Sequence, residues 1–194
     1  MGNHNVIISV KEGADPAAGR VVTEHDGNRT IVVTSDPASI VATAVEAVDE
    51  GAGRIELCGA LGPRWQAKVI EAVGHQVQVG AVMFGFESIT GVADYKARFG
   101  HEFLQAALLY LQPGADPAVD RTVMERADER AFLVAVPDAA TAAAVAVQLV
   151  DGDGVQLIEM YGGFEPADAA RVIDAIDTRA PVGLASYGSP ASIH

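Results

Sequence analysis

Two glutamates stand at matching places in two short apolar segments, and they are the residues of this sequence best suited to chemistry. Glu56 is the second residue of the segment 55–58 (IELC), and Glu159 is the second residue of the segment 158–161 (IEMY). A carboxylate in a buried strand is costly unless it is paired, hydrogen-bonded or protonated. Two such carboxylates that share one proton would supply a general acid and a general base, or they could hold a cation. The alternative is that each glutamate binds a neighbouring amide or arginine and keeps the core in register.

Cys58 lies two residues after Glu56, and in a strand this spacing puts both side chains on the same face. A thiolate at a strand end, before a glycine turn, is a candidate catalytic nucleophile. Tyr161 takes the equivalent place in the second segment, and no histidine recurs beside either position. Cys58 therefore has two interpretations, a catalytic thiolate or a small residue of a pocket or core. Tyr161 is expected to line a ligand pocket.

Glycine turns follow the apolar segments and are candidate ligand-binding loops. In a (βα)8 barrel, the loops after the seventh and eighth strands often bind phosphate through backbone amides. The alternative is that these are tight turns that need a positive φ, and the sequence has neither a G-x-G-x-x-G nor a Walker pattern. The residues expected to bind a ligand, besides Tyr161, are Gly59, Gly162, Gly163, Ser186, Gly188 and Ser189.

The residues that could do chemistry recur because the chain contains one unit twice. Residues 55–85 align without a gap with residues 158–188, and the segment GADPA at 13–17 returns at 114–118. Self-similarity over such a long period predicts a repeated structural unit. We therefore expect a gene duplication, with a first repeat at 1–100 and a second at 101–194, either as two domains or integrated in one.

Each repeat alternates between expected strands and expected helices. Short segments rich in Val, Ile and Leu, apolar on both faces, are typical of parallel strands covered by helices. Strands are expected at 6–10, 30–34, 54–58, 77–84, 107–111, 131–136, 156–161 and 182–187. Helices are expected at 38–50, 64–73, 139–150 and 167–177, and within 88–105.

Two further features of the chain bear on these elements. Asp36, followed by Pro37, and Asp138 precede Ala-rich amphipathic segments, and they are expected to cap those helices. The segments 15–25 and 116–126 are expected to be short helices. A competing interpretation makes residues 25–28 (HDGN) a hairpin turn, which would place strands on both sides of it.

The even spacing of strands predicts eight βα-type units in an α/β fold. The favoured arrangement is a compact (βα)8 TIM-like barrel, because no flexible linker occurs near residue 100. The alternative is a pair of four-stranded doubly wound domains about a pseudo-dyad. A length of 194 residues, which is small for a barrel, and the lack of an expected eighth helix favour this alternative.

Two stretches of the chain carry a resemblance to a known family. Residues 55–63 (IELCGALGP) and 158–166 (IEMYGGFEP) are each followed by the pattern A-K/R-V-I-E/D-A, and a GADP turn stands near the start of each repeat. These motifs resemble a bacterial family known only as domain of unknown function 6506, whose members carry one copy with a consensus near I-E-L-C-G-G-F-G-P. The resemblance implies a tandem fusion of two copies and implies no activity. Tyr161 and Ala60 depart from that consensus.

Composition narrows the classes of function. The chain has 26 acidic and 13 basic residues, a formal net charge of −13, and the basic residues are scattered, which argues against binding to nucleic acid or an anionic membrane. The single cysteine and the absence of a signal peptide predict a cytoplasmic protein. The five histidines show no metal-ligand spacing, so we expect no metal site. The acid–base chemistry that we expect needs no cofactor.

These observations lead to an expected function. The leading hypothesis is a small-molecule enzyme, isomerase- or lyase-like, in which Glu56 and Glu159 move protons next to a carbonyl group. The expected partner is a small-molecule ligand bound at the strand carboxyl ends, and the chain is expected to be a monomer or a homodimer. The alternatives are a non-catalytic ligand-binding protein and a purely structural duplication.

Overall fold

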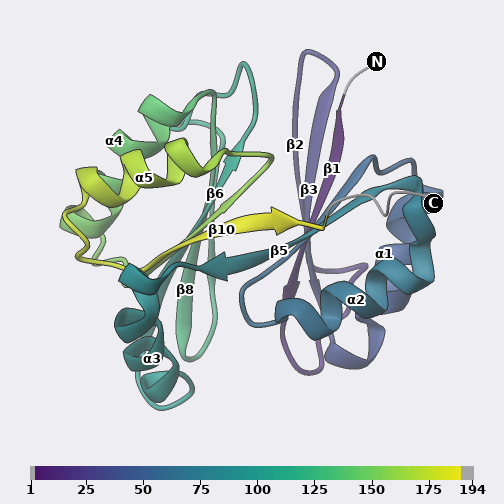
Figure 1. Cartoon of the computed structure of the whole chain (residues 1–194), viewed down its shortest axis with the longest axis horizontal. Coiled ribbons are helices and arrows are strands. Elements are labelled where there is room, and N and C mark those ends of the chain that lie inside the picture. The colour runs from purple at the N-terminus through teal and green to yellow at the C-terminus, as the bar shows by residue number, and fades with distance from the viewer. Residues whose placement is uncertain (1–2, 189–194) are drawn as a thin grey trace. The chain divides into compact units, whose positions relative to one another are not determined.

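The computed structural model describes residues 3–188 and has a mixed α/β architecture (Figure 1). The chain divides into two compact units, one made of Met1–Val82 with Ala185–His194 and the other of Met83–Leu184. Two strands therefore pass from one unit into the other. No helix among the described residues is long and apolar enough to cross a membrane.

The first unit is a mixed sheet with helices on one face. Its strands lie in the order β2-β3-β1-β4-β5, where β1 pairs in parallel with β3 and β4, β4 pairs in parallel with β5, and β2 is antiparallel to β3. Short 3-10 turns precede α1 and follow α2. The elements are β1 His4–Val10, β2 Arg20–His25, β3 Asn28–Ser35, α1 Ile40–Asp49, β4 Arg54–Leu57, α2 Gly62–Val73 and β5 Gln78–Phe84.

The second unit repeats this plan and adds a helix. Its strands lie in the order β10-β9-β6-β8-β7, in which β7 is antiparallel to β8 and the other pairs are parallel. A 3-10 turn at Phe86–Ser88 leads into the added helix. The elements are α3 Ile89–Arg98, β6 Leu104–Leu111, β7 Arg121–Glu125, β8 Glu129–Val136, α4 Ala139–Gly152, β9 Leu157–Tyr161, α5 Pro166–Ala175 and β10 Val182–Tyr187.

All eight expected strands and all five expected helices are present, but the expected (βα)8 barrel is wrong. A TIM barrel places each strand beside the strands that precede and follow it in sequence, all in parallel. Here β1 lies between β3 and β4, and each unit contains an antiparallel pair. The difference arises from the path of the chain. After β1 the chain forms the hairpin β2–β3, and β3 pairs with β1. The connection through α1 then passes over β1, so that β4 pairs with the other side of β1.

The prediction of short helices at 15–25 and 116–126 is wrong, since these segments contain the strands β2 and β7. The competing interpretation of residues 25–28 is confirmed, since β2 and β3 form a hairpin with the pair His25–Asn28 at its end. Asp26 and Gly27 have φ of 50° and 77°, the left-handed conformation that such a two-residue turn requires. The β-branched run from Val21 to Thr23 favours a strand, and this preference outweighs the polar ends of the segment.

Helices cover different faces of the second sheet. Residues of α4 and α5, such as Leu149 and Val172, pack with Val134 and Ile158 in one core. On the opposite face Tyr95 of α3 packs with Leu104, Ala106 and Leu157, whose side chains alternate with those of that core. Sheet residues of this unit are therefore buried on both faces.

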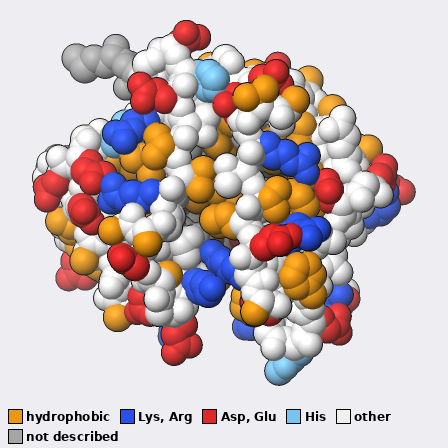
Figure 2. Space-filling view, turned by 180° about the vertical axis from the view of Figure 1, so that it is seen from behind, with side chains coloured by type: hydrophobic (Ala, Val, Ile, Leu, Met, Phe, Trp, Pro, Cys, Tyr) orange, Lys and Arg blue, Asp and Glu red, His pale blue; other side chains and the backbone are white. Residues whose placement is uncertain are grey.

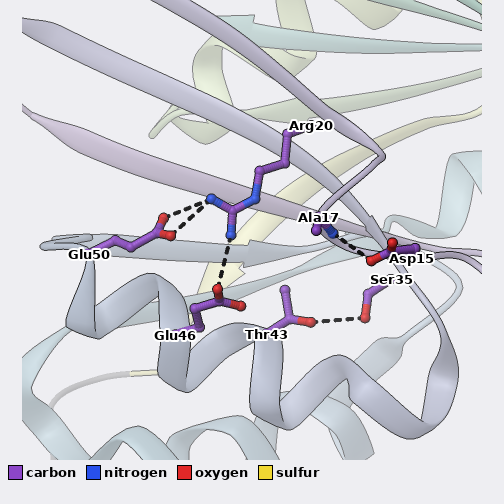
Figure 3. A network of polar contacts seen from close by, with 7 residues as sticks. All are labelled: Asp15, Ala17, Arg20, Ser35, Thr43, Glu46 and Glu50. Atoms are coloured by element: carbon purple, nitrogen blue, oxygen red, sulfur yellow. Dashed lines mark hydrogen bonds and ion pairs between the residues drawn. The ribbon is translucent and has the colours of Figure 1, made fainter.

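Ion pairs at equivalent positions of the two repeats connect the first helix of each repeat to the edge strand of its sheet. In the first unit Arg20 of β2 reaches Glu50 at 3.0 Å and Glu46 at 3.7 Å, both on or next to α1 (Figure 3). In the second unit Arg121 of β7 forms an ion pair of 3.0 Å with Asp153, which follows α4. These pairs are partly exposed, so they contribute more to orientation than to stability.

The expected cap at Asp138 is confirmed, whereas Asp36 caps the 3-10 turn at Pro37–Ser39 and not α1, whose N-cap residue Ser39 makes no capping bond with its side chain. Oδ1 of Asp36 accepts a hydrogen bond from the backbone N–H of Ala38, and Oδ1 of Asp138 accepts one from that of Thr141 at 2.7 Å. The pKa of Asp138 is lowered chiefly by this bond from Thr141, and the pKa of Asp36 is lowered by backbone bonds from Gly13 and then Ala38. Both side chains therefore favour the folded state in their charged form.

The lowered pKa of Asp138 predicts a pH-dependent stability contribution. A depressed folded-state pKa stabilises the protein above the usual value of 3.8, and this gain is lost as the pH falls through the folded-state pKa. We expect Asp138→Ala to lower Tm at pH 7 and to change it much less under acidic conditions below that usual value. Thermal unfolding of both proteins across this range checks the prediction, and an equal Tm difference throughout would contradict it.

Candidate functional site

Glu56 lies on the face of the first sheet opposite α1 and α2. The helix-covered face is identified by Ser35, whose hydroxyl shares a hydrogen bond of 3.0 Å with that of Thr43 in α1 (Figure 3). Ser35 is the register partner of Val10 in β1, whereas Glu56 is the register partner of Ile7. Side chains alternate along a strand, so Ile7 and Glu56 point away from the helices. The Glu56 side chain is fully buried, at 0% exposure.

Two neutral groups from distant parts of the chain hold the Glu56 carboxyl. Asn5 Nδ2 in β1 donates to Oε2 at 2.6 Å, and the Tyr187 hydroxyl in β10 donates to Oε1 at 2.5 Å. The Tyr187 ring lies against Gly80, where a Cβ atom would be 2.8 Å from the ring, and the Arg54 guanidinium lies 5.3 Å from the ring centroid. Donors of this kind reduce the cost of burying a carboxylate.

Two polar atoms near Glu56 are buried and have no hydrogen-bond partner among residues 3–188. Asn5 is 3% exposed, and its Oδ1 accepts no hydrogen bond from the described residues. Arg54 Nε is also buried and unbonded within the described chain. Asn5 and Arg54 are register partners in β1 and β4, so this acceptor and this donor belong to neighbouring positions of the sheet. Buried polar groups are normally hydrogen-bonded, and an unsatisfied pair therefore needs an explanation.

Glu159 has a related environment built from different residues. It is 7% exposed, and the hydroxyl of the fully buried Tyr161, two residues along β9, donates to Oε2. The Tyr95 hydroxyl donates to Glu129 at 3.0 Å. Burial and then the Glu129 carboxylate raise the pKa of Tyr95 far above its usual value, with a smaller contribution from Glu159. Tyr95 therefore stays protonated and acts as a donor.

Each glutamate has a phenol donor, but the two phenols stand at different positions of the repeat. In the aligned repeats Cys58 corresponds to Tyr161, and Phe84 corresponds to Tyr187. The first unit has its tyrosine on β10, and the second has its tyrosine on β9 beside the glutamate. The pair of a buried glutamate and a phenol is thus common to both units, although neither tyrosine is repeated.

The sheet faces around the two glutamates differ in polarity. Buried polar residues share the sheet face of Glu56, and the positions that correspond to them in the second unit are mostly apolar. The polar face could therefore hydrogen-bond a ligand, whereas the second face has the composition of a core. The pairs, first unit before second, are Asn5 and Ala106, Ser9 and Tyr110, Thr23 and Met124, Thr30 and Ala131, and Thr34 and Ala135.

The candidate residues identified in the sequence fall into two groups. Glu56 and Cys58 lie in the first unit, and Glu159 and Tyr161 lie in the second. Because the two glutamates belong to different units, the sharing of one proton between them stays a prediction. Ser189 lies outside the described residues. The remaining candidates divide as Gly59, Ser186 and Gly188 in the first unit and Gly162 and Gly163 in the second.

The loop after β4 forms an open depression of about 470 Å³ that Gly59–Trp65 line. Lys68 lies over the Trp65 ring at 4.4 Å from its centroid. The barrel that would have grouped Gly162 and Gly163 with the loop at Gly188 is absent, and these two loops belong to different units. Within the described chain, no three His, Cys, Asp or Glu side chains gather in a group that could hold a metal ion.

Sequence reasoning missed Asn5 and Tyr187, which both donate to Glu56. Asn5 is a polar residue inside an apolar strand, the same anomaly that drew attention to Glu56. Tyr187 could have been found from the aligned repeats, because the second repeat has tyrosine at both positions, Tyr161 and Tyr187, where the first repeat has Cys58 and Phe84. A comparison of identical residues alone does not reveal these replacements.

The turn at Gly162 predicts a large substitution effect. Its φ is +87°, and a Cβ atom would lie 2.7 Å from the backbone nitrogen of Leu111. We expect Gly162→Ala to cost roughly 3 kcal/mol or more, from the positive φ and the close approach together. Gly51, with φ of +91° and open space around it, is the matched control, and its change to Ala should cost about 1–2 kcal/mol. Chemical denaturation measures both, and equal costs would contradict the role of the Leu111 contact.

The phenol donors predict paired effects on stability. Tyr187→Phe and Tyr161→Phe each remove one donor from a buried glutamate, and each should cost about 1–3 kcal/mol in free energy of unfolding. The exposed Ser186, also on β10, is the control, and Ser186→Ala should change stability by less than about 0.5 kcal/mol. Denaturant unfolding of the three variants gives the values. A neutral Tyr187→Phe would show that Glu56 does not depend on this donor.

Comparison with known proteins agrees with the repeats. A model of a family of unknown function, DUF6506, matches residues 4–97 and again residues 104–192. The resemblance of the glycine-containing motifs to this family is therefore confirmed, and the two matched segments are consistent with tandem halves. No curated protein and no solved structure matches the chain.

Proposed function

The chain belongs to the DUF6506 family, which it matches in two tandem segments, and from that premise we propose that its first unit carries an acid–base site for a small carbonyl compound. The observation that carries the proposal is the fully buried Glu56 carboxyl, which neutral donors hold beside the unused acceptor Oδ1 of Asn5. An arrangement of this kind is costly for stability and is typical of functional sites.

The residues of this cluster divide the chemistry between them. Glu56 takes a proton from the carbon next to the substrate carbonyl, and the electron pair of that C–H bond moves to the carbonyl oxygen to form an enolate. Arg54 Nε is a donor for the oxygen that gains this charge. Asn5 and Tyr187 orient the carboxyl of Glu56. Return of the proton to a different atom gives an isomer, so that no redox cofactor takes part.

Other properties of the protein belong to the same proposal. In the view of Figure 2, Lys and Arg side chains stand in separate small groups among acidic ones, which favours a small-molecule partner over nucleic acid. The single cysteine, Cys58, is buried, and it lines the site rather than forming a disulfide. A reducing cytoplasm suits such a residue. The two matched family segments support an origin by gene duplication.

Proton exchange in D2O tests the proposed activity without knowledge of the natural substrate. The protein is incubated with a panel of 2-oxo and 3-oxo acids, and loss of the C–H signal next to the carbonyl is followed by 1H NMR. We expect exchange above the buffer rate for at least one compound. Glu56→Gln should remove it while leaving stability equal or higher, because the costly buried carboxylate is replaced by an amide.

Two further variants sharpen the interpretation of this experiment. Glu71→Gln, on the exposed surface of α2, is the control and should exchange protons like the unmodified protein. Glu159→Gln distinguishes a site confined to the first unit, which keeps its activity, from a pair of glutamates that share a proton, which loses it. Exchange that persists in Glu56→Gln would overturn the proposal.

A non-catalytic ligand-binding protein is the second candidate. The depression formed by Gly59–Trp65 at the end of β4 favours it, since this depression does not include Glu56. Saturable binding of a panel compound without proton exchange would identify this function. A structural duplication would give neither binding nor exchange, and Glu56→Gln would then cost a few kcal/mol of stability because the buried donors lose their charged acceptor.

A further inference from the structure

The compact units do not coincide with the sequence repeats. The first family segment ends at residue 97, yet the second unit begins at Met83. The second segment continues to residue 192, yet the chain from Ala185 onwards belongs to the first unit. The changes of unit fall inside β5 and β10, which are matching strands of the two repeats.

The C-terminal part of the first repeat packs in the second unit through specific contacts. Ser88 Oγ accepts from the backbone N–H of Val182 at 3.1 Å and donates to the Val182 carbonyl at 3.3 Å. Tyr95 donates to Glu129 at 3.0 Å. Gly91 packs so closely on Pro181 that a Cβ atom would lie 3.0 Å from it. These contacts fix α3 on residues that only the second repeat supplies.

The C-terminal part of the second repeat packs in the first unit in the corresponding way. Gln66 Nε2 in α2 donates to the carbonyls of Val79 and Ser186, both at 3.0 Å, and so joins β5 and β10. Tyr187 donates to Glu56 and stacks on Gly80. The Glu56 site is therefore complete only when the end of the second repeat is in place.

We propose that the two repeats are completed by reciprocal exchange of their C-terminal segments. Each unit is a composite, in which one repeat supplies most of the sheet and its two packed helices and the other supplies a terminal segment. Tyr187 is a positioning residue that the second repeat provides to Glu56 of the first. The partner that fits the incomplete face of one repeat is a second copy of the same repeat, here covalently attached.

Substitutions in the C-terminal segments of the repeats test whether these segments are swapped between the repeats. The two cases predict that different parts of the protein are destabilised. If the segments are swapped, Tyr187→Ala destabilises the first unit, although Tyr187 belongs to the second repeat. Tyr95→Ala likewise loosens the second unit, although Tyr95 belongs to the first repeat. If the segments are not swapped, each substitution would destabilise the repeat that contains it. Hydrogen–deuterium exchange of the full chain, followed by mass spectrometry of peptides, separates the two cases.

The expected result is a crossed pattern of amide exchange. Tyr187→Ala should speed exchange at least about tenfold in β4 and α2, with little change in β9 and α5. Tyr95→Ala should do so in β6 and β9, with little change in β1 and β4. Ser186→Ala is the control and should leave all peptides unchanged. Faster exchange confined to the substituted repeat would overturn the proposal.

A second measurement keeps the test decisive if an alanine variant unfolds. A protease site is placed in the exposed loop at Gly100 and His101, between the repeats, and the folded full chain is cleaved there. If the repeats have swapped their C-terminal segments, the two fragments should stay together as one species near 20 kDa on dilution, with an unchanged Tm. Fragments that separate on size-exclusion chromatography would show that neither repeat holds a segment of the other.

Discussion

The hydrogen bond between a buried glutamate and a tyrosine hydroxyl organises both units of this protein. A carboxyl group at 0% exposure, such as that of Glu56, requires donors that reach it within the sheet. Its donors Asn5 and Tyr187 come from β1 and β10, the first and last strands of the described residues. The requirement of one side chain therefore brings the two ends of the sequence into one compact unit. Gly80 has no side chain because the Tyr187 ring occupies that space.

The second unit meets the same requirement within a single strand. Tyr161 and Glu159 are two residues apart on β9, so the donor and the acceptor share a sheet face without help from another element. The position that corresponds to Tyr187 is Phe84, which packs in an apolar cluster with Tyr95. A tyrosine at both positions of one unit would place two phenols at one carboxyl. The second repeat supplies both tyrosines, one to each unit, so each glutamate has one phenol.

Local signals in the sequence predicted the elements but not their neighbours. The eight strands and five helices follow from apolar periodicity and from caps such as Asp138, whose effects extend over a few residues. The order of the strands depends on contacts between residues far apart, and no local pattern indicates that β1 lies between β3 and β4. β2 was missed because its sequence is half polar, as an edge strand that faces solvent allows. Glu56 and Glu159 were found because a charge inside an apolar strand is anomalous, whereas Tyr187 is ordinary at a strand end.

The difference between the two sheet faces bears on which copy carries chemistry. If the duplication served only to build a stable fold, both faces would be expected to become apolar, since buried polar groups seldom stabilise better than packed side chains. Apart from Glu159, Tyr110 and Tyr161, the second face follows this expectation, with Ala106 and Ala131 at the positions of Asn5 and Thr30. The first face keeps its polar residues and leaves Asn5 Oδ1 without a bond from the described chain. Retention of these polar residues in one unit alone agrees with the proposal that the first unit binds a ligand.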